Sequence, residues 1–175
     1  MSEIKLIFTG TPGAGKTTAI GAISETPPVS TDAATTDDLA ERKSETTVAM
    51  DFGEFTLEDG QKVHLYGTPG QRRFDFMWKI LIEGGLGLVI LIDNTRADPL
   101  ADLDMYLENF EGFIRETGAV IGVTRTDIRQ TPTVDDYYAR LSDRGMMFPV
   151  FEADVRDPAD VLLLMDALLS TLEYS

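Results

Sequence analysis

The stretch that decides the fold of this 175-residue chain is Thr9-Gly10-Thr11-Pro12-Gly13-Ala14-Gly15-Lys16-Thr17-Thr18. It fits the pattern G-x-x-x-x-G-K-[ST], with two glycines, the lysine and a threonine at the fixed positions. The mostly apolar residues 4–8 before it predict a buried strand, and residues 17–23 after it can begin a helix. In that context backbone N–H groups turn around a phosphate, and the helix N-terminus adds positive potential. The sequence therefore predicts a loop that holds the phosphates of a nucleoside triphosphate.

Two side chains of this loop carry chemistry. Lys16 would reach the β- and γ-phosphates and stabilise the charge that develops there during hydrolysis. The Thr17 hydroxyl would ligate Mg²⁺. The residues that we expect to contact the nucleotide in this loop are Gly10, Gly13, Ala14, Gly15, Lys16, Thr17 and Thr18.

Composition and charge restrict the class of protein. The hydrophobic content is 43%, and the net charge is −15 from 30 acidic and 15 basic residues. Such a charge argues against nucleic acid and anionic membranes as partners. Without cysteine, no disulfide, thiolate metal site or cysteine-linked lipid anchor is expected. The longest apolar run, 86–92, is far shorter than the ~20 residues of a membrane helix, so we expect a cytoplasmic protein without direct membrane insertion.

Strand and helix patterns alternate along the chain. Strands are expected at about 3–9, 47–57, 61–66, 86–92, 119–123 and 147–151. Helices are expected at about 16–24, 37–43, 98–116 and 134–144, and from 157 onward. The pattern predicts one α/β domain over residues 1–175, with a six-stranded, mostly parallel sheet, one antiparallel edge strand and about five helices on both faces. The long connection 24–46 has little apolar periodicity, which is typical of a functional loop.

Four further segments fall in the order and strand positions of small Ras-like GTPases. They are Thr47-Val48-Ala49-Met50-Asp51-Phe52, Tyr66-Gly67-Thr68-Pro69-Gly70-Gln71-Arg72-Arg73-Phe74, Val123-Thr124-Arg125-Thr126-Asp127 and Phe151-Glu152-Ala153-Asp154. With the phosphate loop they cover about residues 3–156, and the chain resembles the Ras-like small GTPase superfamily. The most similar group is the bacterial one that includes the MglA-type polarity GTPases and the conservon GTPases. The resemblance implies a P-loop G domain with switch I at about 25–47 and switch II at about 67–80.

The resemblance assigns roles at the γ-phosphate. Thr47 takes the position of the switch I threonine that ligates Mg²⁺ and bonds the γ-phosphate, with Thr46 as the off-by-one alternative. Gly70 would offer its backbone N–H to the γ-phosphate. Gln71 falls where the family keeps the glutamine that orients the attacking water, so it is the expected catalytic residue beside Lys16.

The segment after residue 123 indicates which base is bound. Asp127 should accept two hydrogen bonds, from the ring N–H and the exocyclic amine of guanine. Adenine lacks that pair of donors, so its complex would leave the carboxylate unpaired, at a cost of ~1–3 kcal/mol. By resemblance Thr124 and Arg125 complete this base-binding motif, and Ala153 presents its backbone N–H to the guanine oxygen.

Several positions depart from the family pattern. Gly67 stands where most relatives have an aspartate that holds a Mg²⁺-bound water. Arg125 replaces a lysine and Thr124 an asparagine, which points to a softer guanine preference. Pro12 lies beside the γ-phosphate, where many relatives have glycine.

Other polar residues near the predicted site have two readings. Asp93 ends an apolar run and resembles a Walker B acid, which would favour an ATPase, although Rab-like GTPases carry an aspartate there without a metal role. Arg42, Arg72 and Arg73 are candidates for an arginine finger in cis, or ordinary solvated arginines. The single histidine, His64, lies on a predicted edge strand and is interpreted as structural.

These observations predict a Mg²⁺-dependent GTP switch. Hydrolysis to GDP should be slow, below ~10⁻² s⁻¹, because no arginine finger is evident in cis. The resemblance implies a small Roadblock/LC7-type regulatory protein as partner. Two alternatives stay open: a P-loop ATPase or small-molecule kinase that uses Asp93, and a nucleotide-gated scaffold with negligible hydrolysis.

Overall fold

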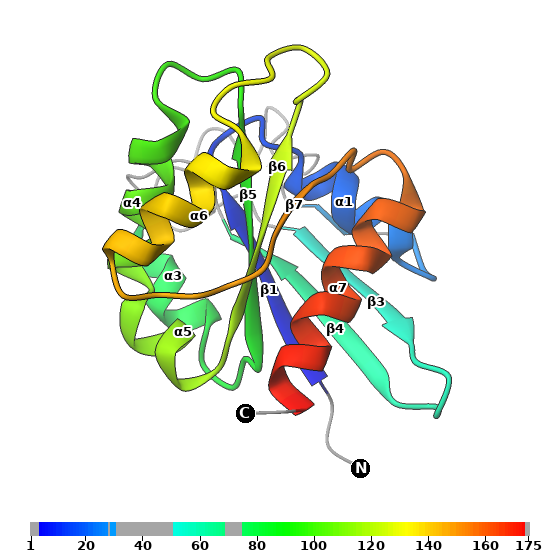
Figure 1. The fold of residues 1–175 in the computed structure, drawn as a ribbon. Helices are drawn as coiled ribbons and strands as arrows, with labels where there is room; N and C mark the ends of the chain where they lie inside the picture. Colours follow the sequence, from blue (N-terminus) through cyan, green and yellow to red (C-terminus); the bar gives the residue numbers. More distant parts are fainter. Residues whose placement is uncertain (1–3, 28, 31–50, 69–74, 174–175) are drawn as a thin grey trace, which may run out of the picture.

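A computed structural model describes residues 4–27, 29–30, 51–68 and 75–173 (Figure 1). Its strands are β1 (Ile4–Gly10), β2 (Val29–Ser30), β3 (Asp51–Thr56), β4 (Lys62–Gly67), β5 (Gly87–Asp93), β6 (Ala119–Thr124) and β7 (Val150–Glu152). Its helices are α1 (Lys16–Ile23), α3 (Asp75–Leu81), α4 (Pro99–Asn109), α5 (Glu111–Glu116), α6 (Val134–Asp143) and α7 (Pro158–Glu173). Strands and helices therefore alternate as the sequence predicts.

All the strands belong to one sheet, in the order β2-β3-β4-β1-β5-β6-β7. Strand β1 pairs in parallel with β4 and β5, and parallel pairing continues through β6 to β7. Strand β3 is antiparallel to β4, and β2 is antiparallel to β3. The predicted mostly parallel α/β sheet is confirmed, and its six longer strands are the predicted ones. The two-residue strand β2 is an addition, which places β3 one strand in from the edge.

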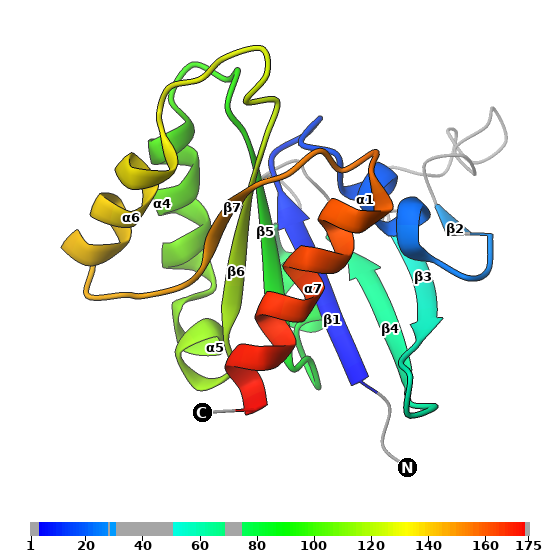
Figure 2. The same ribbon diagram turned by 45° about the vertical axis from the view of Figure 1, so that its right-hand side comes forward.

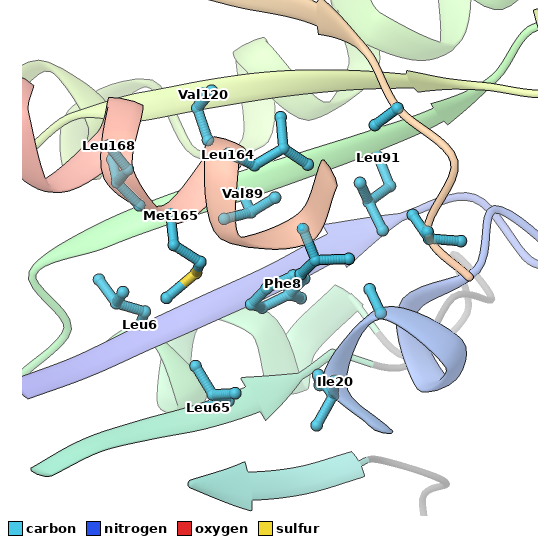
Figure 3. Packing of buried hydrophobic residues seen from close by; sticks show 14 of the residues in the cluster. Leu6, Phe8, Ile20, Leu65, Val89, Leu91, Val120, Leu164, Met165 and Leu168 are labelled. Atoms are coloured by element: carbon cyan, nitrogen blue, oxygen red, sulfur yellow. The ribbon is translucent and has the colours of Figure 1, made fainter. Parts of the chain in front are cut away.

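Helices cover both faces of the sheet (Figures 1 and 2). On one face α1 and α7 pack over a core that includes Phe8, Ile20 and Leu164, all buried (Figure 3). On the other face α3, α4, α5 and α6 enclose a second core. There the Trp78 ring stacks on Phe110 with 5.3 Å between the ring centroids. The two cores fix the sheet between two helical layers, as burial of both faces of a parallel sheet requires.

The helices agree with the predicted ones at some boundaries and differ from them at others. The expected helix over 98–116 is divided into α4 and α5 at Phe110, whose φ of −111° lies outside the helical region. Helix α7 begins as predicted, because the Asp157 carboxylate accepts from the Ala159 N–H at 2.9 Å. Helix α3 was not predicted. The expected helix at 37–43 lies outside the described residues.

The topology gathers the chain's loops at one edge of the sheet. Strands β1, β4, β5 and β6 run in the same direction, so their carboxyl ends lie together, and antiparallel β3 begins at the same edge (Figure 2). Open α/β sheets bind ligands at this edge. In the described part of the chain, no helix has the length and apolar character needed to cross a bilayer.

Candidate functional site

The phosphate-binding loop joins β1 to α1 at the ligand-binding edge. Gly15 is the N-cap of α1 and has a φ of 103°, a conformation that favours glycine. A Cβ at Gly15 would lie 2.6 Å from the Val155 Cγ2 atom, so the loop also packs closely against the segment after β7. The loop therefore needs glycine here for both backbone conformation and space.

The side chain of Lys16 lies along the inside of this loop. It is 8% exposed, and its Nζ donates to the carbonyls of Gly10 at 2.7 Å and Thr11 at 3.1 Å. The Ala14 N–H donates to the Thr11 carbonyl at 3.0 Å, which closes the turn. Carbonyls of the loop thus hold the Lys16 ammonium close to the N-terminus of α1.

A pocket of about 500 Å³ extends from this loop across the ends of β6 and β7. The phosphate loop and α1 contribute Ala14, Gly15 and Thr18. The loop after β6 contributes Thr124, Arg125, Thr126, Asp127 and Ile128, and the β7–α7 segment contributes Glu152, Ala153, Asp154, Val155, Arg156 and Asp160. Residues predicted to bind phosphate and residues predicted to bind the base therefore line one cavity.

Asp127 presents its carboxylate at this cavity. The residue is exposed, and it accepts no hydrogen bond from the described residues. Across the pocket, hydrogen bonds to Asp154 raise the pKa of the Arg156 guanidinium, and the negative charge of Asp127 adds to the same shift. An exposed carboxylate without an internal hydrogen bond suits a ligand group that donates two hydrogen bonds.

Internal hydrogen bonds hold the loop that carries Asp127. Asn94 is fully buried, and its Nδ2 donates to the carbonyls of Arg129 at 2.8 Å and Pro132 at 3.1 Å. Its Oδ1 accepts from the Tyr137 hydroxyl at 2.6 Å. The loop after β6 is thereby tied to the end of β5 and to α6.

Asp93 and Arg125 form an ion pair at the base of this loop. The Arg125 Nη1 donates to the Asp93 Oδ2 at 2.6 Å, and the other Asp93 oxygen accepts from the Thr95 N–H at 2.9 Å and hydroxyl at 2.6 Å. Both Asp93 oxygens are engaged, which favours the structural reading of this residue over the metal-binding one. Arg125 still lines the pocket, with a φ of 60°.

The Ala153 N–H, expected to be offered to the base, is already bonded within the sheet. It donates to the Val123 carbonyl at 2.9 Å, continuing the pairing of β6 with β7. The amide of Val155, two residues further on, makes no hydrogen bond to the described residues and lies where the chain has left the sheet. The expectation was based on the match of Ala153 to the alanine of the family motif. In the structure, the position at which strand β7 ends decides which backbone amide is available to a ligand.

One acidic residue near the phosphate loop was not anticipated. The Thr17 hydroxyl donates to the Asp51 Oδ2 at 2.7 Å, and Asp51 is 6% exposed. The Asp51 Oδ1 atom is buried and has no hydrogen-bond partner among the described residues. A hydroxyl and a carboxylate are oxygen ligands of the kind that Mg²⁺ prefers, so these two residues fit that ion. The sequence feature that could have identified Asp51 is an acidic residue at a core-facing position of a strand with alternating burial.

Mg²⁺ characteristically takes few protein ligands and keeps waters and substrate phosphates for the rest. Residues 4–27, 29–30, 51–68 and 75–173 contain no cluster of three or more His, Cys, Asp or Glu side chains suited to a metal. The other metal and γ-phosphate candidates, Thr47 with its alternative Thr46 and Gly70, lie outside the described residues. So do Gln71 and the candidate finger arginines Arg42, Arg72 and Arg73.

Comparison with protein families assigns the chain. Residues 27–147, more than half of its length, match the family described as conserved hypothetical ATP binding protein. The chain belongs to this family. The matched region starts after the phosphate-binding loop. The loop is therefore evidence for nucleotide binding that is independent of the family match.

Two curated relatives resemble parts of this family member. It is 38% identical over 50 residues to the uncharacterized protein MJ1339 of Methanocaldococcus jannaschii, which covers 29% of this chain and 32% of that protein. It is 27% identical over 97 residues to the Ras-related protein RABA6b of Arabidopsis thaliana, which covers 53% of this chain and 42% of that protein. The chain thus spans less than half the length of either relative.

A solved structure shares the fold. The bacterial selenocysteine-specific elongation factor EF-Sec superposes with a TM-score of 0.67 at 18% identity, over 98% of this chain and 29% of that one. Taken together, the family, the Ras-related relative and this fold support a nucleotide-binding P-loop protein of the GTPase type. The assignment to the MglA-type or conservon-type group stays a prediction.

Proposed function

We propose that this chain binds GTP with Mg²⁺, hydrolyses it slowly to GDP and phosphate, and changes its switch loops and protein contacts with the state of the nucleotide. The observation that carries the choice of GTP is the Asp127 carboxylate, exposed at the same pocket as the phosphate loop and bonded to no described residue. Thr124 and Arg125 form the adjoining wall, and the Val155 amide is the donor that we assign to the guanine carbonyl.

The physical basis of base choice is hydrogen-bond complementarity. Guanine offers a ring N–H and an exocyclic amine side by side, and one carboxylate accepts both. Adenine offers an acceptor beside its amine, which leaves one carboxylate oxygen facing a lone pair. A site built to accept such donors rejects a ligand that lacks them, because its own polar group is then left unpaired.

At the phosphate end, Lys16 and the first turn of α1 supply positive charge and N–H donors to the phosphates. Of the two predicted Mg²⁺ ligands, Thr17 is the one that the structure describes, and the ion when bound would neutralise charge on the phosphates. Thr47 and Gly70 would contact the γ-phosphate and so couple the two switch loops to the triphosphate state. Gln71 would orient the attacking water.

ATP is the second candidate ligand, because the family's description names ATP binding. Against it, both oxygens of Asp93, the acid that an ATPase reading would use, are engaged by Arg125 and Thr95. A nucleotide-gated scaffold differs from the proposal only in its hydrolysis rate. A Roadblock/LC7-type regulator belongs to the proposal as a partner that would recognise one nucleotide state.

The decisive experiment identifies the nucleotide. The protein is purified without added nucleotide, and any bound nucleotide is identified by mass after denaturation. A fluorescent methylanthraniloyl-GDP complex is then challenged with GDP, GTP, ADP and ATP. We expect guanine nucleotides to displace the probe at least about 100-fold better than adenine nucleotides. Adenine nucleotides in the purified protein, or equal displacement, would contradict the assignment.

Gln71→Ala is expected to slow single-turnover GTP hydrolysis by about 10- to 100-fold while leaving GTP affinity nearly unchanged. The reason is that positioning of the water matters in the transition state, whereas the glutamine contributes little to binding of the ground state. The measurement follows phosphate release from preloaded protein with Mg²⁺, beside a Gln130→Ala control, which removes an exposed glutamine outside the residues lining the pocket. Identical rates in Gln71→Ala and the unsubstituted protein would remove Gln71 from this role.

A further inference from the structure

The most informative unexplained residue is Asp51, which lies opposite Gly67 in the antiparallel pair of β3 and β4. Gly67 is the position where the family resemblance implies an acid near Mg²⁺, and this chain has none there. Asp51 begins β3 at the edge of the sheet where the phosphate loop lies. An acid is therefore present in the neighbouring strand at the point where one is missing.

The two positions compete for the same space. A Cβ placed on Gly67 would lie 3.2 Å from both the Cβ and the Oδ2 of Asp51, and 3.2 Å from the Ile20 Cδ1. These separations are tighter than ordinary van der Waals contact, so a side chain at position 67 would require its neighbours, the Asp51 carboxylate among them, to shift. Gly67 thus allows the close approach of Asp51. The acid that is absent at position 67 has a counterpart at position 51 on the neighbouring strand.

The Asp51 carboxylate is directed at the first turn of α1. Its Oδ2 accepts from the Thr17 hydroxyl at 2.7 Å, which is the hydroxyl that a P-loop offers to Mg²⁺. A structural role at the helix N-terminus explains that oxygen. It does not explain Oδ1, which is buried and has no donor among the residues that the structure describes. Burying a carboxylate with one oxygen unsatisfied is costly unless a ligand, a cation or its water, completes the site.

We propose that Asp51 is the acidic positioning residue for the Mg²⁺ ion of the bound nucleotide, in place of the acid absent at Gly67. The proposal rests on one part of the proposed function, the binding of a nucleotide–Mg²⁺ complex at the phosphate loop. It holds whether the base of that nucleotide is guanine or adenine. Asp51 acts from β3, so the ion is tied to the strand that directly follows the predicted switch I. Asp93 is the rival acid, and its engagement with Arg125 leaves Asp51 as the better placed of the two.

The test measures how Mg²⁺ controls nucleotide release. Protein loaded with methylanthraniloyl-GDP, or the ADP analogue if adenine is the bound base, is chased with unlabelled nucleotide over a series of buffered Mg²⁺ concentrations. Asp51→Asn keeps the shape and an acceptor for Thr17 but removes the charge. We expect it to raise the Mg²⁺ concentration that halves the release rate by about 10- to 100-fold. Glu54→Gln, an acid on the other face of the same strand, should behave as the unsubstituted protein.

A relocation experiment separates a metal role from a role in folding. Gly67→Asp alone crowds two carboxylates and should weaken Mg²⁺ binding or stability. Asp51→Gly combined with Gly67→Asp moves the acid to β4 and should recover most of the lost Mg²⁺ dependence. Electron paramagnetic resonance titration with Mn²⁺ reports metal affinity directly, without any turnover, and should rank the variants in the same order.

The outcomes are distinct. Unchanged Mg²⁺ dependence and Mn²⁺ affinity in a folded Asp51→Asn protein would overturn the proposal, and so would a shift caused by Asp93→Asn in its place. Nucleotide release that ignores Mg²⁺ in the unsubstituted protein would overturn both this proposal and the proposed function. An adenine preference with intact Mg²⁺ control through Asp51 would refute only the GTP assignment.

Discussion

Replacing Asp127 with asparagine is expected to weaken GTP binding by about 100-fold, or about 2.7 kcal/mol, and to create affinity for XTP. The carboxylate has no hydrogen-bond partner among the described residues and faces the pocket shared with the phosphate loop. We therefore expect both carboxylate oxygens to be available as hydrogen-bond acceptors for the ligand. Two hydrogen bonds to a charged acceptor contribute about 1.5–3 kcal/mol each when they are shielded from water, so their loss accounts for the magnitude.

The gain for XTP follows from the same geometry. An asparagine amide has one acceptor and one donor, so its NH₂ would oppose the exocyclic amine of guanine. Xanthine carries a carbonyl at that position, and its ring N–H remains, so both groups of the asparagine find partners. The substitution thereby inverts the preference instead of merely weakening it, which an effect on folding alone would not do.

Isothermal titration with GDP, XDP and ADP would measure the change. Asp143→Asn is the matched control, because it removes the same charge from an exposed position on α6, outside the residues lining the pocket. GDP affinity that survives Asp127→Asn without any gain for XDP would show that the base is read elsewhere.

Sequence pattern predicts most of this fold because the relevant signals are local. The phosphate loop is a contiguous motif, and the apolar strands β5 and β6 need no partner information to be recognised. The alternation of strands and helices favours a mostly parallel sheet, whereas the order of its strands is seen only in the structure. The division of the 98–116 helix at Phe110 was not predictable in this way, since the apolar stripe continues through it and no local breaker such as proline marks the position.

The candidate site was predicted less completely, because its missing parts depend on contacts between strands. Asp51 reads as an ordinary polar residue until β3 is paired with β4 and its carboxylate meets Thr17. The engagement of the Ala153 amide depends likewise on the register of β7 against β6. Pairing partners and register are set by tertiary packing, which a single sequence does not display.

The second large effect is expected from Lys16→Ala, which should reduce affinity for both GDP and GTP by about 100- to 1,000-fold. The Lys16 ammonium is held by the carbonyls of Gly10 and Thr11, and the residue is only 8% exposed. An ion pair between an ammonium and a phosphate is strong in such a partly desolvated site. Alanine has no group that could replace this ion pair. The backbone N–H groups of the loop remain and would provide the residual affinity.

Thermal denaturation distinguishes this loss of binding from a loss of folding. Excess GDP should raise the melting temperature of the unsubstituted protein, because a ligand that binds only the folded state stabilises it by mass action. The same addition should leave Lys16→Ala unchanged, although the two proteins melt at similar temperatures without nucleotide. Lys62→Ala removes the same charge from β4 at an exposed position, and it should respond to GDP as the unsubstituted protein does. A full GDP response in Lys16→Ala would show that the loop does not hold the phosphates, and the assignment of the whole pocket would fail with it.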